Sequence, residues 1–473
     1  MQIVAGIEIH IQLQTKTKAF SASPIGFGGS PNERASAIDI GMPGTLPVVN
    51  KEMLSQAIML GTWLNSKINA LNTFARKHYF YPDLPKGYQI TQDENPILTG
   101  GYLEYEVKGE TKRCELHHAH LEEDAGKSVH GYKHGISGVD LNRAGQPLLE
   151  IVTEPCLNNI DEIIAFLKRM HSIVTYLGIC DGNMQEGSFR CDVNVSIRKD
   201  EHAPLGTRVE LKNMNSFKFI QKALEFEISR QTDLLEDGKK IVQETRQYNE
   251  KTGKTESMRD KETAQDYRYF KDPDIPAVWI DDAFIAEAVA RLPESPTDRL
   301  EQYVSLGVPK TEATIIAYNK PMGDYLAYLI QQDLDPKLAS NWLLGPVSEH
   351  ANKEGLLFNA LPISAKELAE LLTALRDDIV SSKMAKEVFG FMWTEQKSAA
   401  TIIEEKGLKQ LTNEDEIAGI IMDIIQNNPS QVDAYRNGKD KLFGFFVGQA
   451  MKATKGQANP ALLNKILKDK LNA

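Results

Sequence analysis

The chain lacks several features that would assign it at once to a common class of protein. No apolar run in its 473 residues approaches the about 18 that a membrane-spanning helix needs. Its start, MQIVAGIEIH, has neither the basic stretch nor the cleavage site of a secretory signal. It contains no GxxxxGKS, GxxxxGKT or GxSxG motif, so neither a P-loop nor a serine hydrolase site is expected.

Cysteine is scarce. The four that occur stand far apart in the sequence without a CxxC pair: Cys114, Cys156, Cys180 and Cys191. A disulfide framework is therefore not expected, and unpaired thiols indicate a reducing, cytoplasmic location. Three histidines lie close together in residues 117–120, but a zinc site would need cysteines or a second histidine pair.

Charge is unevenly distributed along the chain. The formal net charge is −11, yet residues 431–473 carry eight Lys or Arg against three Asp. This tail therefore has a net charge of +5, and the first 430 residues carry −16. A basic tail on an acidic body predicts contact with an anionic partner, although a solvated helical surface has the same composition.

Two changes of character divide the chain. Residues 1–292 mix strands and helices without regular βαβ alternation, which predicts an α+β domain. Two prolines lie near the end of this part, and amphipathic helices follow over residues 293–405. A second break in residues 404–416 predicts a separate helical tail domain over 406–473.

Alternation of apolar and polar residues predicts strands in the first part. From Ile7, the sequence IEIHIQLQ places isoleucine and leucine on one face and Glu8 and His10 on the other. Residues 188–198 and 207–213 alternate in the same way. Helices are expected at 160–177 and at about 216–237, the second closed by Gly238.

The polar faces of these strands carry the candidate site. Glu8 and His10 project in parallel about 7 Å apart, so one ligand can touch both. The other charged groups on comparable faces or in nearby polar segments are Glu122, Glu123, Asp124, Glu150, Arg190, Asp192 and Glu210. Carboxylates combined with an imidazole suit Mg²⁺, which usually acts on phosphates. A half-exposed strand is polar outward in any protein, however, so a solvated surface remains the alternative.

Longer motifs resemble one family along essentially the whole chain. In order they are VAGIEIHIQL, RKHYFYPDLPKGYQI, HLEEDAGKS, DLNRAGQPLLEIV, GSFRCDVNVS, ELKNMNSF, DYRYFKDPDIP and NGKDKLFGFFVGQAMKATKGQANP. They are similar to the B subunit of the tRNA-dependent amidotransferase, GatB of the bacterial GatCAB complex. The archaeal relative GatE carries a large inserted domain, for which this chain has no room.

The resemblance implies ATP-dependent transamidation. In that family the side-chain carboxylate of Glu-tRNA(Gln) or Asp-tRNA(Asn) is phosphorylated by ATP and then amidated with ammonia. The B subunit is implied to carry this site with Mg²⁺, the GatA amidase subunit to release ammonia from glutamine, and GatC to hold the two together. The implied fold is a cradle related to glutamine synthetase and guanido kinases, then a helical domain, then a YqeY-like tail that meets tRNA.

The resemblance also implies individual site residues. The family's metal ligands fall on Glu8, His10, Glu123, Glu150, Asp192 and Glu210. Lys77 matches a residue near the end of the ammonia tunnel, where Glu123 is also implied to act. Arg190 is our own candidate for holding the γ-phosphate. In the basic tail, Lys452 and Lys455 are candidates for contact with tRNA phosphates.

Two other functions remain open from the residues alone. A non-catalytic subunit that binds tRNA or acts as a scaffold explains the basic tail but leaves the polar strand faces without a role. An unrelated metal-dependent hydrolase would be active without any partner subunit.

Overall fold

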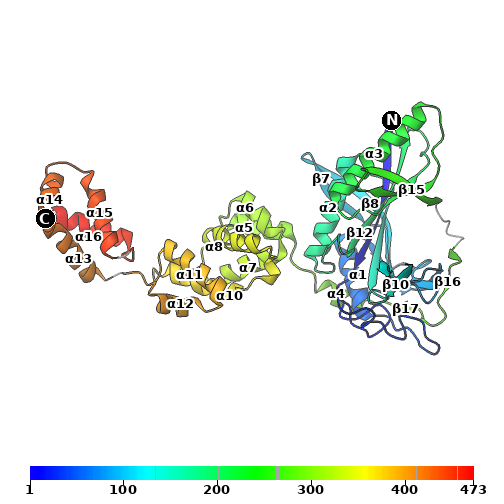
Figure 1. Ribbon diagram of the computed structural model, residues 1–473, viewed down its shortest axis with the longest axis horizontal. Coiled ribbons are helices and arrows are strands. Elements are labelled where there is room, and N and C mark those ends of the chain that lie inside the picture. The colour runs from blue at the N-terminus through cyan, green and yellow to red at the C-terminus, as the bar shows by residue number, and fades with distance from the viewer. Residues whose placement is uncertain (134, 201, 261–266, 412, 455, 473) are drawn as a thin grey trace. The chain divides into compact units, whose positions relative to one another are not determined.

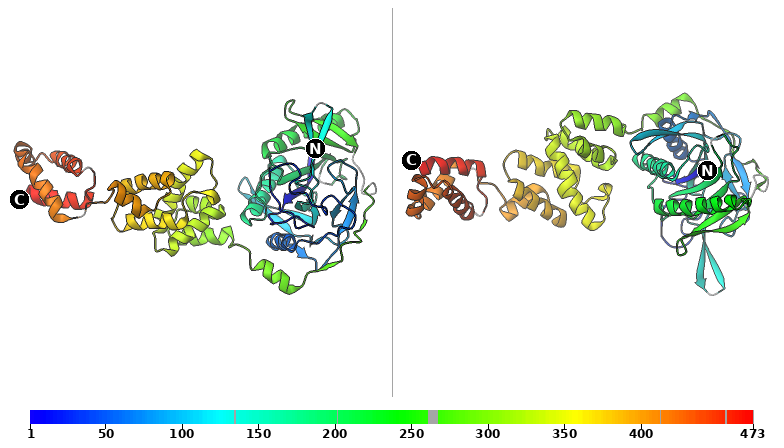
Figure 2. Two further views of the ribbon diagram at one scale, coloured as in Figure 1. Left: turned by 60° about the horizontal axis from the view of Figure 1, so that its bottom comes forward. Right: turned by 90° about the horizontal axis from the view of Figure 1, so that it is seen from above.

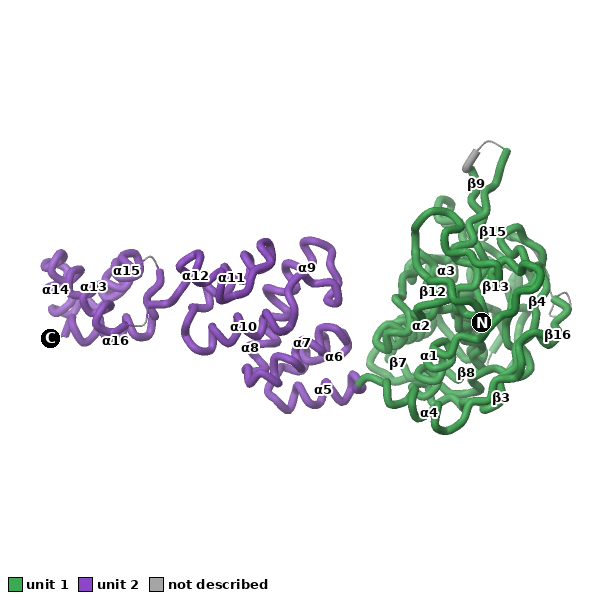
Figure 3. Tube along the Cα trace, turned by 90° about the horizontal axis from the view of Figure 1, so that it is seen from below, with its two compact units in different colours: residues 1–293 green, residues 294–473 purple. Residues whose placement is uncertain are grey.

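The computed structural model describes residues 1–473 except 134, 201, 261–266, 412, 455 and 473. The chain divides into two compact units, Met1–Pro293 and Glu294–Ala473, which Figure 3 colours separately. Unit 1 combines a large sheet with helices, and unit 2 is helical (Figure 1). The predicted α+β region followed by helices is confirmed.

Unit 1 is built on a sheet that has 13 strands in the described residues. Its main path runs through β15 (Lys254–Asp260), β14 (Glu244–Asn249), β13 (Val209–Lys212), β12 (Phe189–Arg198), β1 (Gln2–Gln12), β11 (Pro147–Thr153), β8 (Glu110–Glu123), β5 (Tyr88–Thr91), β4 (Ala75–His78) and β16 (Phe270–Lys271). Off this path lie β2 (Lys67–Ile68), β6 (Leu98–Thr99) and β7 (Tyr102–Val107). Strand β1 is central, because it pairs antiparallel with β12 on one side and with β11 on the other.

Alternation along β1 separates a core face from a polar face. Ile7, Ile9 and Ile11 are at most 1% exposed and belong to the core of unit 1. Glu8 and His10 lie between them and are only partly buried. Helices α1 (Lys51–Trp63), α2 (Ile160–Tyr176) and α3 (Phe217–Glu236) supply residues to the same core (Figure 1). Each isoleucine buried in this way contributes about 1.5–3 kcal/mol.

Polar caps define the ends of the predicted helices. The side chain of Asn159 accepts a hydrogen bond from the backbone N–H of Glu162, at the start of α2. Ser216 does the same for Phe219 at the start of α3, and Gly238, with φ of 70°, follows its end. The helices and strands predicted in this part of the chain are confirmed, with small differences at their ends.

Smaller elements complete unit 1. They are α4 (Asp282–Val289), which packs against α1, and two further strand pairs, β9 (Lys127–Lys133) with β10 (Ile136–Asp140) and β3 (Leu71–Asn72) with β17 (Val278–Trp279). The β9–β10 pair projects from the body of unit 1 (Figure 2).

Unit 2 consists of short helices. They are α5 (Pro296–Ser305), α6 (Lys310–Ala317), α7 (Lys320–Gln331), α8 (Pro336–Trp342), the π-helix η2 (Leu343–Val347), α9 (Ser348–Glu354), the 3₁₀ helix η3 (Phe358–Ala360), α10 (Ala365–Arg376), α11 (Ser382–Glu395), α12 (Ala399–Lys406), α13 (Glu414–Gln426), α14 (Pro429–Arg436), α15 (Leu442–Ala453) and α16 (Pro460–Asn472). Their buried residues form two clusters, one between Tyr303 and Ile403 and one between Ile417 and Leu471. The division into domains 293–405 and 406–473 remains a prediction. Among the described residues, no helix has the length and apolarity of a membrane span.

A buried ion pair fixes the segment that follows β1. The ammonium group of Lys18 lies 2.9 Å from the carboxylate of Asp39, and their side chains are 0% and 3% exposed. Asp39 also accepts hydrogen bonds of 2.8 Å from the Ser21 hydroxyl and the Ser36 backbone N–H. Burial lowers the pKa of Lys18, and Asp39 opposes this effect. Removing either side chain would therefore leave the charge of the other buried without its partner.

We expect Asp39→Ala to lower the free energy of unfolding of unit 1 by about 3–5 kcal/mol, because it leaves the Lys18 ammonium buried and unpaired. Urea denaturation followed by circular dichroism measures this loss. The double variant Lys18→Met, Asp39→Leu removes both charges and should be clearly more stable than Asp39→Ala. Equal losses in the two proteins would contradict the importance of the pairing.

Candidate active and metal-binding site

A β-bulge in β8 changes which of its residues face the core. Before the bulge, Cys114 and Leu116 are buried in the core of unit 1; after it, Ala119 and Leu121 are. The register of β8 against β11 shifts between these two pairs. An extra residue in one strand of an antiparallel pair has this effect.

Because of this shift, alternate side chains at the end of β8 point to the polar face of the sheet. His120 and Glu122 alternate with the buried residues beyond the bulge and lie on the side of the sheet that carries His10. His120 pairs with Glu150 of β11, and Glu150 pairs with His10 of β1. Without the bulge, His120 and Glu122 would point into the apolar core.

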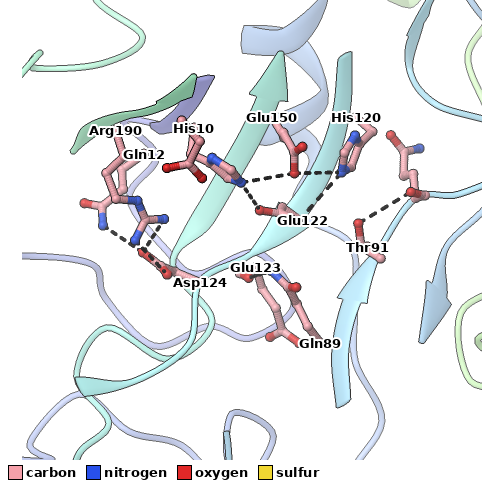
Figure 4. A network of polar contacts seen from close by, with 12 residues as sticks. His10, Gln12, Gln89, Thr91, His120, Glu122, Glu123, Asp124, Glu150 and Arg190 are labelled. Atoms are coloured by element: carbon pink, nitrogen blue, oxygen red, sulfur yellow. Dashed lines mark hydrogen bonds and ion pairs between the residues drawn. The ribbon is translucent and has the colours of Figure 1, made fainter. Parts of the chain in front are cut away.

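The first cluster on this face joins two imidazoles and two carboxylates (Figure 4). His10 Nε2 lies 3.0 Å from Glu150 Oε2 and 3.5 Å from Glu122 Oε1. His120 Nε2 lies 3.4 Å from Glu150 Oε2 and 3.7 Å from Glu122 Oε2. One ligand atom from each of His10, Glu122 and Glu150 lies within 4.8 Å of the others, so one cation can contact all three.

Opposite charges offset the cost of burial in this cluster. Burial disfavours the charged form of His10, but the charge and hydrogen bond of Glu150 together with the charge of Glu122 outweigh it and raise the pKa of His10. The same balance raises the pKa of His120 to about 10. Burial alone would raise the pKa of Glu150, yet the two imidazoles hold it well below its usual value.

A second cluster lies on the neighbouring strands β12, β1 and β13. It contains Glu8, Asp192 and Glu210, with one carboxylate oxygen of each within 4.8 Å of the others. The ammonium of Lys212 lies 2.5 Å from Asp192 and 3.4 Å from Glu210. Burial opposes the charge of Lys212, but the two carboxylates raise its pKa above the usual value.

The donor groups of both clusters fit Mg²⁺. Carboxylate oxygens are its preferred protein ligands, and the single imidazole of His10 is compatible with a divalent ion. In the second cluster Lys212 offsets one of the three negative charges, so the remaining charge matches that of one divalent cation. Glu8, Asp192 and Glu210 would hold one ion, and His10, Glu122 and Glu150 another.

Arg190 lies beside the first cluster and is held by Asp124. Its Nη1 and Nη2 atoms are each 3.3 Å from an Asp124 carboxylate oxygen, and Gln12 donates a 3.1 Å hydrogen bond to the same carboxylate. Asp124 raises the pKa of Arg190. Arg190 also pairs with His10 across β1 and β12. The guanidinium is therefore held in a fixed position at the edge of the site (Figure 4).

Glu123 lies apart from the first cluster (Figure 4). Its carboxylate accepts a 2.9 Å hydrogen bond from the backbone N–H of Ile90 and contacts the Lys86 ammonium. Consecutive strand residues point to opposite faces, so Glu122 and Glu123 cannot serve the same group of ligands. The structure places Glu122, instead of the predicted Glu123, with His10 and Glu150.

Three further predicted site residues come from other parts of the chain. Lys77, on β4, has its ammonium group 4.7 Å from the centre of the Tyr267 ring. Lys452 is exposed in the last turn of α15, and Lys455 lies outside the described residues.

The predicted ligands and catalytic residues do not include His120, Lys86 or Lys212, and they include Glu122 only as a charged neighbour. His120 and Glu122 are two residues apart, so a strand through this segment places them on one face, but no strand is predicted there from the sequence. Lys212 alternates with Glu210 in the predicted strand, but Lys86 comes from a segment between strands and has no local signal.

Comparison with known proteins gives consistent matches over the chain. The family described as the GatB/GatE catalytic domain matches residues 3–286, and the one described as the GatB domain matches residues 324–471. The B subunit of the aspartyl/glutamyl-tRNA(Asn/Gln) amidotransferase of Hydrogenovibrio crunogenus is 50% identical, and the match covers 99% of both chains. The protein of the same name from Thioalkalivibrio sulfidiphilus is 49% identical with equal coverage. Among solved structures, the tRNA-binding domain of glutaminyl-tRNA synthetase from Saccharomyces cerevisiae covers 38% of this chain and 93% of its own, at 17% identity and a TM-score of 0.27.

We expect Mn²⁺, used as a probe for Mg²⁺, to bind unit 1 more tightly as the pH rises. Glu150 raises the pKa of His10, so a metal must displace a proton from this imidazole. Displacing one proton makes affinity rise up to about tenfold per pH unit below that pKa. Calorimetric titrations of the full chain between about pH 6.5 and 8 measure this dependence.

The variant Glu150→Gln should weaken Mn²⁺ binding strongly. Glu115→Gln is the matched control, because Glu115 lies on β8 with a half-exposed side chain paired to Arg113. Mn²⁺ affinity that does not change with pH, or equal affinity in the two variants, would contradict a metal site at His10 and Glu150.

Proposed function

This chain belongs to the GatB family of tRNA-dependent amidotransferase subunits, and from that premise we propose that unit 1 forms the side-chain amide on misacylated tRNA at the expense of ATP. Its substrates are Glu-tRNA(Gln), Asp-tRNA(Asn) or both. The observation that carries the proposal is the pair of carboxylate clusters on one sheet face, with Arg190 beside them. The reaction brings two anions together, and this face offers the groups that such a reaction needs.

The proposed reaction has two steps. A side-chain carboxylate oxygen of the aminoacyl group attacks the γ-phosphorus of ATP, which forms an acyl phosphate and releases ADP. Ammonia then attacks the acyl carbon, phosphate leaves with the electron pair of the broken C–O bond, and the nitrogen loses a proton. Mg²⁺, when bound, would screen the negative charges of the carboxylate and the triphosphate.

The side chains around the clusters have separate roles in this proposal. The Arg190 guanidinium binds the γ-phosphate. Asp124 orients the guanidinium through its contacts with Nη1 and Nη2, and Gln12 in turn donates a hydrogen bond to the Asp124 carboxylate. Glu123 and Lys86 form a charged pair away from the first cluster, where they would meet incoming ammonia. Lys77 would lie on the same route by which ammonia arrives.

The proposal divides the work among partners. Ammonia comes from a separate amidase subunit, GatA, and GatC joins the two subunits. The support for such an assembly is that the curated relatives are named as the B subunit of an amidotransferase.

We expect Asp192→Asn to abolish amide formation by the assembled complex while leaving its glutaminase activity largely unchanged. The substitution removes a carboxylate from the second cluster, and glutamine hydrolysis belongs to another subunit. Amide formation is measured with ammonium as the nitrogen donor, which bypasses the amidase. Asp237→Asn is the control, because Asp237 is exposed and its carboxylate pairs with Lys239 on the surface.

Full activity of Asp192→Asn with ammonium would overturn the catalytic assignment and favour the scaffold alternative. A scaffold predicts that Asp192→Asn and Asp237→Asn form amide at the same rate. A complex that also loses glutaminase activity would point to misassembly, which size-exclusion chromatography detects.

The basic tail is proposed to bind the phosphate backbone of tRNA. We expect removal of residues 406–473 to raise the apparent KM for charged tRNA and to lower turnover at saturating tRNA much less. The deletion should also make tRNA binding less dependent on salt. The slope of log affinity against log salt concentration should become shallower by about one for each phosphate contact removed. Gel-shift titrations at two salt concentrations measure both effects.

Point variants test the tail with the chain intact. Changing the exposed lysines Lys465, Lys468 and Lys470 of α16 to glutamine should weaken tRNA binding. The same change at the exposed Lys366, Lys383 and Lys386, earlier in unit 2, is the matched control. Equal tRNA binding by the two triple variants would show that the tail charge is only a solvated surface.

A further inference from the structure

Two thiols that are far apart in the sequence lie against each other in unit 1. The Sγ atoms of Cys114 and Cys156 are 2.8 Å apart, with either thiol able to donate to the other. Both cysteines are free, and 42 positions separate them in the chain. The scattered positions of the cysteines along the chain give no sign of this pair.

Hydrogen bonds fix the backbone around both thiols. Cys114 lies inside β8, and the N–H of Glu154 donates to the carbonyl of the neighbouring Glu115 at 2.9 Å. On the other side of Cys156, Leu157 exchanges backbone hydrogen bonds with Ala5 of β1, at 2.8 and 3.2 Å. The segment that carries Cys156 is therefore held between two strands. Neither thiol has to move far to meet the other, which favours reaction within the pair over reaction with other thiols.

The two thiols differ in access and in acidity. Cys114 is fully buried in the core of unit 1, whereas Cys156 is partly exposed. The hydrogen bond from Cys114 lowers the pKa of Cys156, while the same contact together with burial raises the pKa of Cys114. Thiolates are the reactive form, so Cys156 is the member that meets a reagent from solvent.

The other two cysteines form an internal comparison. Cys180 and Cys191 are both buried, and burial raises their pKa values, that of Cys180 to about 12. Cys180 donates to the backbone carbonyl of Ser188, and neither cysteine is paired with another thiol in the described residues. These two cysteines are expected to be inert.

We propose that Cys114 and Cys156 form a dithiol that a hydroperoxide oxidises reversibly to a disulfide. The Cys156 thiolate attacks one oxygen of the hydroperoxide, the O–O bond breaks, and an alcohol, or water from hydrogen peroxide, is released. The resulting Cys156 sulfenic acid is attacked by the Cys114 sulfur, which forms the S–S bond and releases water. The pair loses two electrons, the peroxide gains them, and an external dithiol reverses the change.

Oxidation would act beside a cavity that reaches one residue of the candidate site. Thr153 and Pro155 line this cavity of about 460 Å³, and so does Glu8, a member of the second carboxylate cluster. A disulfide at Cys156 would bond this segment covalently to β8. The modification site stands on its own geometry and does not depend on the proposed amide-forming activity.

The test is oxidation of the reduced full-length chain with a small excess of hydrogen peroxide. Remaining thiols are then alkylated under denaturing conditions, and the peptides are mapped by mass spectrometry without reduction. We expect one cross-linked species joining Cys114 and Cys156, removed by dithiothreitol. Cys180 and Cys191 should be oxidised at least about tenfold more slowly.

Variants identify the order of attack. Cys114→Ser should leave a sulfenic acid on Cys156 that dimedone traps, and Cys156→Ser should prevent both trapping and cross-linking. Cys180→Ser is the matched control and should form the disulfide at the wild-type rate. If Cys114→Ser fails to fold, as judged by circular dichroism, peptide mapping of the wild-type chain and of Cys156→Ser decides the question.

Two results would overturn the proposal. One is oxidation of Cys114 and Cys156 no faster than that of Cys180 and Cys191, which would make the contact a packing contact only. The other is peroxide-treated wild-type chain in which Cys156 is oxidised but carries no bond to Cys114.

Discussion

Carboxylates that share one face of a sheet repel one another, and this repulsion determines which side chains lie around them. In the second cluster the Lys212 ammonium lies between Asp192 and Glu210. In the first cluster the imidazoles of His10 and His120 both contact Glu150. These protein cations allow the acidic face to fold, and a bound metal would have to compete with the proton or ammonium already there.

Alternation in the sequence predicts strands β1, β12 and β13, but it does not show which residues of β8 face the core. Alternation in β1 was sufficient to place Glu8 and His10 on one face, because a regular strand keeps its period of two residues. In β8 the bulge shifts that period between Leu116 and Ala119. The residue that joins His10 is therefore Glu122 and not its neighbour Glu123. Nothing in a single sequence shows where a bulge falls, since it depends on pairing with another strand.

The same bulge separates two kinds of chemistry on one strand. Upstream, Cys114 faces the core and meets Cys156, and the hydrogen bond with Cys156 together with burial raises the pKa of the Cys114 thiol. Downstream, His120 and Glu122 face the polar side and meet Glu150. A strand without the shift would place the thiol and the carboxylate on the same face. One inserted residue is therefore enough to direct β8 toward both the core and the site.

If this chain binds tRNA as proposed, the acidic face would limit where the binding can occur. Glu8, Asp192 and Glu210 repel a polyanion at short range, so unit 1 gains little affinity from this face until cations neutralise it. The proposed attraction for the phosphate backbone would then have to come from elsewhere in the chain. Residues 431–473, with a net charge of +5, offer it at the opposite end of the sequence, in a helical cluster with its own core. In the proposed function, tRNA binding and amide formation therefore make opposite demands on charge, and assigning them to different parts of the chain would satisfy both.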